Sequence, residues 1–517
     1  MAGGQILVKK ATLPFSALLE FVAQKKTCPR THSGQVRPGD SFILMPPPQP
    51  GGQGGLDYLR EALAGGAEYL VYAASQKTEL EARLAELAGN APRPTLVQVE
   101  DCRAALGDLA GTCFATAGPS PRLCGVTGTN GKTSCTYMLE QLLNAHGHKV
   151  GVIGTINYRW PGVRRPSCLT TPGCLELHSM IHEMREVGTD TAIMEVSSHA
   201  LAQKRVAGLN FDGALWTNLT QDHLDFHQDT EKYYRCKASL FLGPEEGGTP
   251  ARDKARAVNG DDAHGRRLLD ECAGLPGLTI AYGLGKQNVK RHLQGEILSF
   301  GPEGLRLKHN FHGQFWEIAS PLVGRFNAMN LLGVEALALA LGLEPEDLGA
   351  LEGFTGAPGR LERIANRRGL HVFVDYAHTP DALEKALGAL REAGFRRLIA
   401  VFGCGGNRDR GKRPLMGRVV SRMAEVAVLT SDNPRLEEPL AIIRDVLPGM
   451  DGPAERHIRE DRREATALAL ELARHGDAVL VAGKGHEDYM ILGEKKIPYS
   501  DQEILRKLLG EAEAGPC

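Results

Sequence analysis

The strongest constraint on the fold is an alternation of apolar runs with helical stretches in the last third of the chain. Four apolar runs have the composition of buried strands, and a helical stretch separates each from the next: His371–Tyr376, Arg397–Phe402, Glu425–Thr430 and Asp477–Ala482. Parallel strands joined by helices produce this alternation, and such sheets bind ligands at the carboxyl ends of their strands. The last third is therefore predicted to be a doubly wound α/β domain.

Continuous apolar runs also mark the middle of the chain, at Leu123–Thr127, Thr191–Ser197 and Gly213–Leu219. Uninterrupted runs are typical of strands that a parallel sheet buries on both faces. A long Ala- and Leu-rich helix is expected from Asn327 to Leu343, with a hinge at Gly356–Gly359 after it. The chain has 517 residues, several times the ~150 residues of one domain, so three domains are expected.

Composition excludes several classes of protein. The 60 basic and 62 acidic residues give a net charge of −2, which argues against a nucleic-acid-binding protein. No apolar run approaches the ~20 residues that span a membrane, and the first residues show no signal peptide. Eleven cysteines without a CxxC pair indicate reduced thiols, with neither disulfides nor a zinc site, in a cytoplasmic protein.

The segment Thr127-Gly-Thr-Asn-Gly-Lys-Thr133 lies between a predicted strand and a predicted helix. Its glycines let backbone N–H groups face a phosphate at the helix N-terminus, and Lys132 adds a positive charge. Thr133 offers a hydroxyl to Mg²⁺. The strict phosphate-loop spacing fails, because Val126 stands six positions before Lys132. A nucleotide loop is favoured, and a plain glycine-rich turn stays open.

This segment resembles the ATP loop of the Mur ligases, which extend the peptide of bacterial cell-wall precursors. Further blocks similar to that family follow in the family's order, from about residue 120 to the end: Glu195–His199, Thr217–His227, Asn327–Asn330, Asp375–Pro380, Gly403–Arg413, Ser431–Arg435 and Gly483–Glu487. The set is most similar to the members that add the third residue of the peptide.

A new strand-helix pattern at Thr95–Leu109 and the hinge at Gly356–Gly359 place the domain boundaries. With these bounds, the resemblance implies three α/β domains: a UDP-precursor-binding domain at 1–102, a central ATP-binding domain with a parallel sheet at 103–356, and a Rossmann-like amino-acid-binding domain at 357–517. It implies ATP-dependent addition of meso-diaminopimelate to UDP-N-acetylmuramoyl-L-alanyl-D-glutamate through an acyl phosphate. The expected setting is peptidoglycan synthesis, on which cell shape and division depend, and the expected state is a cytoplasmic monomer without nucleic-acid or membrane partners.

By resemblance, the residues that contact ATP are Gly128, Thr129, Asn130, Gly131, Lys132, Thr133, Asn330, Arg360 and Asp375. The set expected to bind Mg²⁺ is Thr133, Glu195, His223 and Lys237, the last carbamylated by CO₂. Lys132, Glu195, His223 and Lys237 are the expected catalytic residues. Without the resemblance, Glu195 is a solvated carboxylate at a strand end, His223 a structural histidine, and Lys237 an exposed lysine.

Two further sets are implied. The muramoyl-dipeptide precursor is expected at Ser33, Thr170, Thr171, Ser197, Gln203 and Arg205. The incoming amino acid is expected at Arg408, Asp432, Asn433, Arg435, Gly483 and Glu487. Arg435 would hold the distal carboxylate of diaminopimelate, since members that add lysine generally lack this arginine, and Glu487 suits the distal ammonium. The sequence departs from the family at His32 and Gly34, which replace Asp and Arg, and at Asn407, which replaces Asp.

Other functions stay open at this stage. The amino acid is alternatively L-lysine or L-ornithine, and Arg435 is alternatively a solvated loop arginine. Folylpolyglutamate synthetase is the nearest enzyme of the superfamily, although Asp432–Arg435 argues against it. A non-catalytic scaffold of the same family is the alternative outside enzymes, and the joint presence of Lys132, Glu195, His223 and Lys237 argues against it.

Overall fold

The structure is a computed structural model that describes residues 12–25, 27–47, 51–87, 93–116, 118, 121–220, 224–243 and 253–510. The chain divides into two compact units, one of residues 1–127, 148–214 and 221–254, the other of 128–147, 215–220 and 255–517. The domain boundaries predicted at 102/103 and 356/357 stay predictions. Within the described ranges no helix has the length and apolar character needed to cross a membrane.

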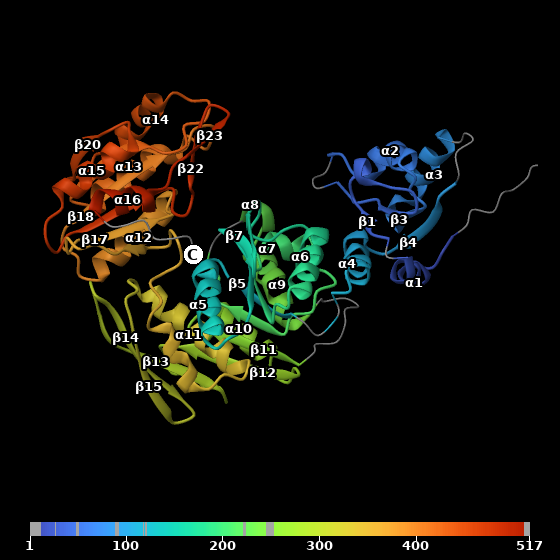
Figure 1. Cartoon of the computed structure of the whole chain (residues 1–517), viewed down its shortest axis with the longest axis horizontal. Helices are drawn as coiled ribbons and strands as arrows, with labels where there is room; N and C mark the ends of the chain where they lie inside the picture. Colours follow the sequence, from blue (N-terminus) through green and yellow to red (C-terminus); the bar gives the residue numbers. More distant parts are fainter. Residues whose placement is uncertain are drawn as a thin grey trace, which may run out of the picture. The chain divides into compact units, whose positions relative to one another are not determined.

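A parallel four-stranded sheet organises the N-terminal residues, in the order β1 (Pro29–Arg30), β2 (Ser41–Ile43), β3 (Tyr69–Ala73) and β4 (Thr95–Val99). Val71 packs on one face with α1 (Phe15–Lys25) and α4 (Cys102–Cys113). Leu70 packs on the other with α2 (Leu59–Ala64) and α3 (Lys77–Glu86) (Figure 1). Alternating side chains thus give each face of the sheet its own pair of helices.

A disulfide joins Cys28 to Cys113 in this part of the chain, which corrects the expectation that all cysteines are reduced thiols. The two residues are 85 positions apart, yet their Cα atoms lie 5.6 Å apart, because α4 packs next to β1. No local spacing marks such a pair, so the sequence did not reveal it. The other eight cysteines that the structure describes form no disulfide.

The first unit also holds strands of the central sheet. Strands β5 (Arg122–Thr127), β9 (Thr191–Glu195) and β6 (Val150–Ile153) are parallel neighbours, and β7 (Asn157–Trp160) and β8 (Val163–Pro166) add antiparallel strands. Strand β10 spans Gly213–Trp216. The helices that accompany these strands are α6 (Cys174–Glu186), α7 (Ser198–Ala202), α8 (Leu224–His227) and α9 (Thr230–Leu242).

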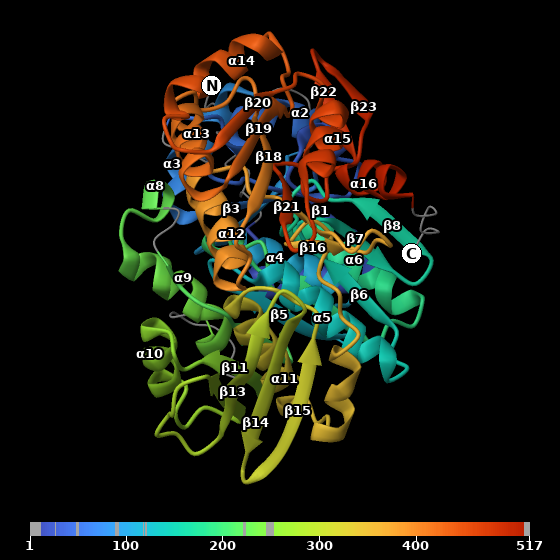
Figure 2. The same ribbon diagram turned by 90° about the vertical axis from the view of Figure 1, so that its left-hand side faces the viewer.

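In the second unit, α5 (Lys132–Ala145) packs against α11 (Arg325–Ala340), which confirms the predicted long helix. Sequence analysis missed an antiparallel ribbon, seen in yellow-green in Figure 2. It comprises β13 (His292–Gly301), β14 (Gly304–Phe311) and β15 (Gln314–Ser320), and β13 also pairs in parallel with β12 (Gly277–Gly283). The remaining elements of this region are β11 (Lys254–Asn259) and α10 (Ala263–Glu271).

The C-terminal sheet confirms the doubly wound prediction. Its order is β16 (Glu362–Ile364), β17 (His371–Asp375), β21 (Ala478–Ala482), β18 (Leu398–Cys404), β19 (Val426–Ser431) and β20 (Glu455–Ile458), parallel except for β16. Helices α12 (Pro380–Glu392), α13 (Lys412–Met423) and α14 (Pro439–Val446) cover one face. Helices α15 (Arg462–Leu472) and α16 (Asp501–Leu509) cover the other (Figure 2). A hairpin, β22 (Tyr489–Leu492) and β23 (Lys495–Pro498), follows β21.

Candidate functional site

The glycine loop connects the end of β5 to the start of α5, as predicted. Gly131 caps α5 with a φ of 87°, a left-handed conformation that favours glycine. A Cβ on Gly131 would lie 2.5 Å from the Asn330 side-chain oxygen, and one on Gly128 would lie 1.9 Å from the Thr217 hydroxyl. Lys132 Nζ donates to the carbonyls of Gly128 and Thr129, at 2.7 and 2.9 Å. Both glycines are therefore required by backbone shape and by close packing.

The segment after β10 holds this loop in place. The backbone N–H groups of Thr129 and Asn130 donate to Asn218, at 2.9 and 3.0 Å. The Thr217 hydroxyl donates to the Asn130 carbonyl at 2.6 Å. Sequence analysis recognised this block but gave Thr217 and Asn218 no role, since their contact with the loop spans about 90 positions, for example 87 between Thr217 and Asn130.

Glu195 is a buried carboxylate at the end of β9, with 1% of its surface exposed. It is therefore not the solvated strand-end carboxylate that its sequence position alone suggested. Thr155 donates to both of its oxygens, through the backbone N–H and the hydroxyl, each at 2.9 Å. Thr133 is likewise buried, at the first turn of α5. These oxygen groups are of the kind that Mg²⁺ prefers.

Five of the six residues predicted to contact the muramoyl-dipeptide, all except Ser33, form one hydrogen-bonded cluster next to Glu195. The Thr171 hydroxyl donates to the Glu195 carbonyl at 2.8 Å and contacts the Ser197 hydroxyl at 3.2 Å. Arg205 donates to the Thr171 carbonyl at 2.8 Å and, through two nitrogens, to the Gln203 side chain at 2.8 and 3.0 Å. The Thr170 hydroxyl lies 3.1 Å from that of Thr155. The contact of these residues with the muramoyl-dipeptide stays a prediction.

Lys237 lies on α9 with 1% of its surface exposed, so the interpretation of an exposed lysine is wrong. Its ammonium lies 4.9 Å from the centre of the Tyr233 ring, one turn earlier on the helix. His223, the fourth predicted metal ligand, is outside the described residues. Among the residues that are described, no three His, Cys, Asp or Glu side chains gather as a metal-binding group. The metal set stays a prediction.

Ser33 begins a short 3₁₀ turn in the N-terminal sheet region and is buried. Its hydroxyl donates to Glu61 Oε2 at 2.6 Å. Neighbouring His32 and Gly34, where the sequence departs from the family, are exposed. The Ser33 hydroxyl is thus engaged inside its own domain, and a contact with UDP stays a prediction.

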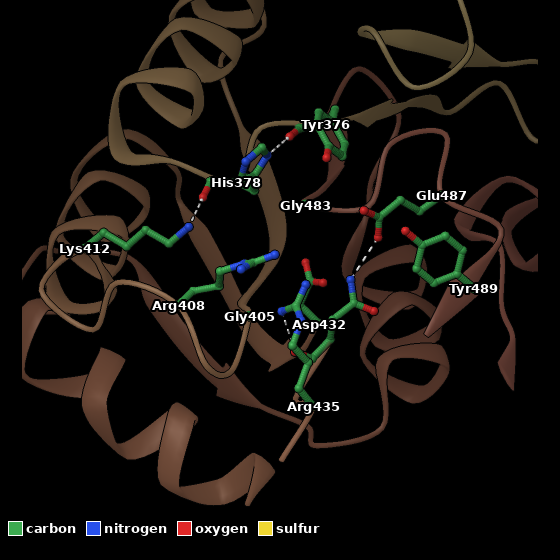
Figure 3. Close-up of a pocket in the computed structure, with 11 residues that line it drawn as sticks. Tyr376, His378, Gly405, Arg408, Lys412, Asp432, Arg435, Gly483, Glu487 and Tyr489 are labelled. Carbon is green, nitrogen blue, oxygen red and sulfur yellow. Dashed lines mark hydrogen bonds between the residues drawn. The ribbon is translucent and has the colours of Figure 1, made fainter. Parts of the chain in front are cut away.

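A pocket of about 340 Å³ lies in the C-terminal domain. It gathers residues that follow β17, β18, β19 and β21, at the carboxyl ends of four parallel strands, as the alternation predicted. All six residues predicted to bind the amino acid line it. The full lining is Tyr376, His378, Gly405, Arg408, Lys412, Asp432, Asn433, Arg435, Gly483, Glu487 and Tyr489. Figure 3 shows Arg408, Lys412 and His378 on one side and Glu487 and Tyr489 on the other.

The pocket carries charges of both signs. Arg408, Lys412 and Arg435 are cationic, whereas Asp432 and Glu487 are anionic. Burial raises the pKa of Tyr489, and the charge of Glu487 adds to this increase, so the phenol keeps its proton. Asn433 Nδ2 donates to Glu487 Oε2 at 2.9 Å. A ligand with both carboxylates and ammonium groups would find partners on opposite walls.

Arg435 is held in a left-handed conformation, with a φ of 54°. The β22 hairpin fixes its backbone: the N–H of Arg435 donates to the Ile491 carbonyl at 3.0 Å, and Gly493 donates back at 2.8 Å. The guanidinium donates to the Gly406 carbonyl at 3.0 Å. Asn407 is left-handed as well, and its side-chain oxygen accepts from the Leu436 N–H at 3.0 Å. Asparagine and aspartate both tolerate this conformation and both offer an oxygen to the Leu436 N–H, so the departure at 407 is compatible with the local geometry.

Asp375 and Arg360, two of the residues predicted to contact ATP, are both polar groups with a defined setting in the C-terminal domain. The Asp375 carboxylate accepts N–H groups from Leu361 and Ala377, at 2.7 and 2.8 Å. Burial raises the pKa of Asp375, and the charge of Arg360 opposes that increase. The Arg360 guanidinium lies 5.1 Å from the centre of the Tyr376 ring, and its Nε has no hydrogen-bond partner among the described residues. Arg360 therefore has a buried donor for a ligand.

Comparison with known proteins decides the family. The Mur ligase middle domain matches residues 126–338, and the Mur ligase glutamate ligase domain matches residues 359–485. UDP-N-acetylmuramoyl-L-alanyl-D-glutamate–2,6-diaminopimelate ligase of Lawsonia intracellularis is 46% identical over 499 residues, covering 96% of this chain and 99% of the relative. The chain belongs to the Mur ligase family.

Solved structures of Mur ligases and their relatives agree with this assignment. A UDP-N-acetylmuramoyl-L-alanyl-D-glutamate–2,6-diaminopimelate ligase is 31% identical, with a TM-score of 0.68 over 93% of this chain and 94% of that one. Folylpolyglutamate synthase of Mycobacterium tuberculosis is 18% identical, with a TM-score of 0.57 over 80% of this chain and 95% of its own. The latter likeness concerns the fold alone.

Sequence analysis of this Mur ligase missed several lining residues of the pocket, namely Tyr376, His378, Gly405, Lys412 and Tyr489. Tyr376 and His378 lie in the recognised block Asp375–Pro380, and Lys412 lies in Gly403–Arg413. Their place directly after β17 and β18 was the available signal, because ligands bind beyond the strand ends. Tyr489 lies two residues after the last block and carried no such signal.

Proposed function

We propose that the chain is an ATP-dependent ligase that joins meso-diaminopimelate to UDP-N-acetylmuramoyl-L-alanyl-D-glutamate in peptidoglycan synthesis. The observation that carries the proposal is the pocket at the strand ends, which both Arg435 and Glu487 line. The 46% identity to a ligase named for the same reaction supports it.

The pocket matches the charges of diaminopimelate. This amino acid carries a carboxylate and an ammonium at each end, so a selective site needs both cations and anions at fixed positions. Arg435 offers a planar guanidinium to the distal carboxylate, and Glu487 accepts from the distal ammonium. Lysine lacks the distal carboxylate and would leave Arg435 unmatched.

The chemistry follows from amide formation. The glutamyl carboxylate attacks the γ-phosphorus of ATP and releases ADP, which gives an acyl phosphate. The amine of diaminopimelate then attacks the carbonyl carbon, loses a proton, and expels phosphate. Negative charge accumulates in both steps, and Lys132 and Arg360 would offset it. Phosphoryl transfer depends mainly on positioning and electrostatics, so no nucleophilic side chain is required.

Mg²⁺ fits the donors of this chain. The buried Glu195 carboxylate and the Thr133 hydroxyl are hard oxygen ligands, and carbamylation would turn the buried Lys237 into a third oxygen group, which is anionic. These residues, together with His223, would hold the ion. When bound, it neutralises phosphate charge. We place the reaction in the cytoplasm, where ATP and the nucleotide-linked precursor occur, and expect a monomer.

The test is phosphate release from ATP by the purified chain with the UDP-muramoyl-dipeptide and one amino acid at a time. Release that requires the dipeptide and diaminopimelate together supports the proposal. Release that requires a folate and glutamate would indicate a folylpolyglutamate synthetase. Absence of release with any amino acid would indicate a non-catalytic scaffold.

A further inference from the structure

Lys484 is a fully buried lysine directly behind the amino-acid pocket, with none of its surface exposed. It follows β21 between Gly483 and Glu487, which both line the pocket, while Lys484 is not part of the lining. An ammonium is almost never buried without partners, because its desolvation is costly. Its contacts therefore indicate what it stabilises.

The ammonium of Lys484 contacts residues that line the pocket, among them the two acidic ones, Asp432 and Glu487. It donates to Asn433 Oδ1 at 3.0 Å and to the Tyr489 carbonyl at 2.9 Å. It also lies 3.7 Å from a carboxylate oxygen of Asp432 and 3.7 Å from one of Glu487. All four of these contacted residues line the pocket.

Asn433 connects Lys484 to Glu487 and to the β22 hairpin. The side chain that accepts from Lys484 also donates, through Nδ2, to Glu487 Oε2 at 2.9 Å. Its Oδ1 also accepts the N–H of Ile491, at 2.9 Å, in the hairpin that fixes Arg435. Burial lowers the pKa of Lys484, and the charges of Asp432 and Glu487 oppose that decrease. One buried cation thus joins the acidic residues and the hairpin.

We infer that Lys484 is a positioning residue that fixes Asp432, Asn433 and Glu487 for the incoming amino acid without touching it. The inference rests on the proposed function, because it concerns the same pocket. Removal of the Lys484 charge leaves the Asp432 and Glu487 carboxylates without the cation that they share. These side chains, and Asn433 between them, would then no longer be held in their positions in the pocket. The loss concerns the amino acid rather than ATP or the dipeptide.

The test compares Lys484→Met and Lys484→Gln with Lys495→Gln, which removes an exposed lysine of the nearby hairpin. Steady-state phosphate release gives KM separately for diaminopimelate, ATP and the dipeptide. Because misplaced binding groups cost about ten- to a hundredfold, KM for diaminopimelate should rise by that factor, with the other two KM values within about twofold. Lys495→Gln should match the wild type.

A double-mutant cycle with Glu487→Gln adds a readout that a purely structural role would not move. If Lys484 acts through Glu487, the double variant has nearly the KM of Glu487→Gln alone. Additive effects, unchanged KM values, or loss of folded protein in both Lys484 variants by circular dichroism would overturn the inference. A wild-type chain that ligates no amino acid would instead refute the proposed function itself.

Discussion

Lys237 and Lys484 show how burial changes what a lysine can do. Both are almost completely buried, at 1% and 0% exposure. Lys484 lies near two carboxylates, which stabilise its positive charge. Lys237 lies against the Tyr233 ring, on a helix of the ATP-binding region. Carbamylation would replace its ammonium with an anion that suits a metal-binding role.

Replacement of Lys237 by alanine should abolish ligation, because the anionic group at that position is lost. Short-chain carboxylic acids should restore part of the activity by occupying the space of the carbamate. Phosphate release with and without acetate measures both effects. Lys232→Ala is the matched control, since Lys232 is an exposed lysine of the same helix. Full activity of the untreated Lys237→Ala protein would refute the role.

Arg435→Ala should weaken the use of diaminopimelate much more than that of lysine. The change removes a charge-assisted pair worth ~1.5–3 kcal/mol, which corresponds to about a ten- to hundredfold loss in kcat/KM. Arg444→Ala removes an exposed arginine from α14 and should have no effect. An equal loss of kcat/KM for diaminopimelate and for lysine would show that Arg435 does not bind the distal carboxylate.

At the scale of elements, the glycine loop depends on the close approach of Gly131 to the Asn330 side chain and of Gly128 to the Thr217 hydroxyl. Gly131→Ala places a methyl group 2.5 Å from the Asn330 side chain, in addition to the strain of a positive φ. Gly147, just after α5, also has a positive φ, 80°, but open space around its Cβ position. The two substitutions share the backbone cost of about 1 kcal/mol and differ only in the clash.

Gly131→Ala should therefore lose ATP turnover while it remains folded, whereas Gly147→Ala should retain turnover. ADP production and circular dichroism on both variants provide the measurement. Similar turnover in the two variants would mean that the loop tolerates displacement from Asn330.

The elements that sequence predicted are those with continuous apolar runs. The predicted strand 371–376 became β17 (His371–Asp375), and 425–430 became β19 (Val426–Ser431), because burial on both faces requires an unbroken apolar run. Strand β14 was missed since its exposed and buried residues alternate. Its signal is therefore weaker than that of an unbroken apolar run, and its partners alternate over only part of their length, β13 at its start and β15 at its end.

At the scale of the whole molecule, the candidate site combines motifs that the sequence identified, although their contacts with one another could not be predicted from it. The six predicted amino-acid-binding residues line one pocket because parallel strands end at the same edge of the sheet. The burial of Lys237 and the role of Lys484 depend on tertiary packing, which has no local sequence pattern. The same is true of the disulfide between Cys28 and Cys113.

The disulfide gives a prediction for the intact chain. Eleven cysteines, of which two are paired, should leave nine reactive thiols when the unreduced protein is unfolded in guanidinium and titrated. Prior reduction should raise the number to eleven. Eleven thiols without reduction would show that Cys28 and Cys113 remain unpaired in the isolated protein, as the sequence alone suggested.

The most direct test of the account is competition for the pocket. The wild-type chain is given ATP, the UDP-muramoyl-dipeptide, and equal concentrations of diaminopimelate, lysine and ornithine, and the products are identified by mass spectrometry. Because only diaminopimelate has a distal carboxylate for Arg435 as well as a distal ammonium for Glu487, its product should predominate. A product containing mainly lysine or ornithine would contradict the assignment of Arg435 and of the amino acid.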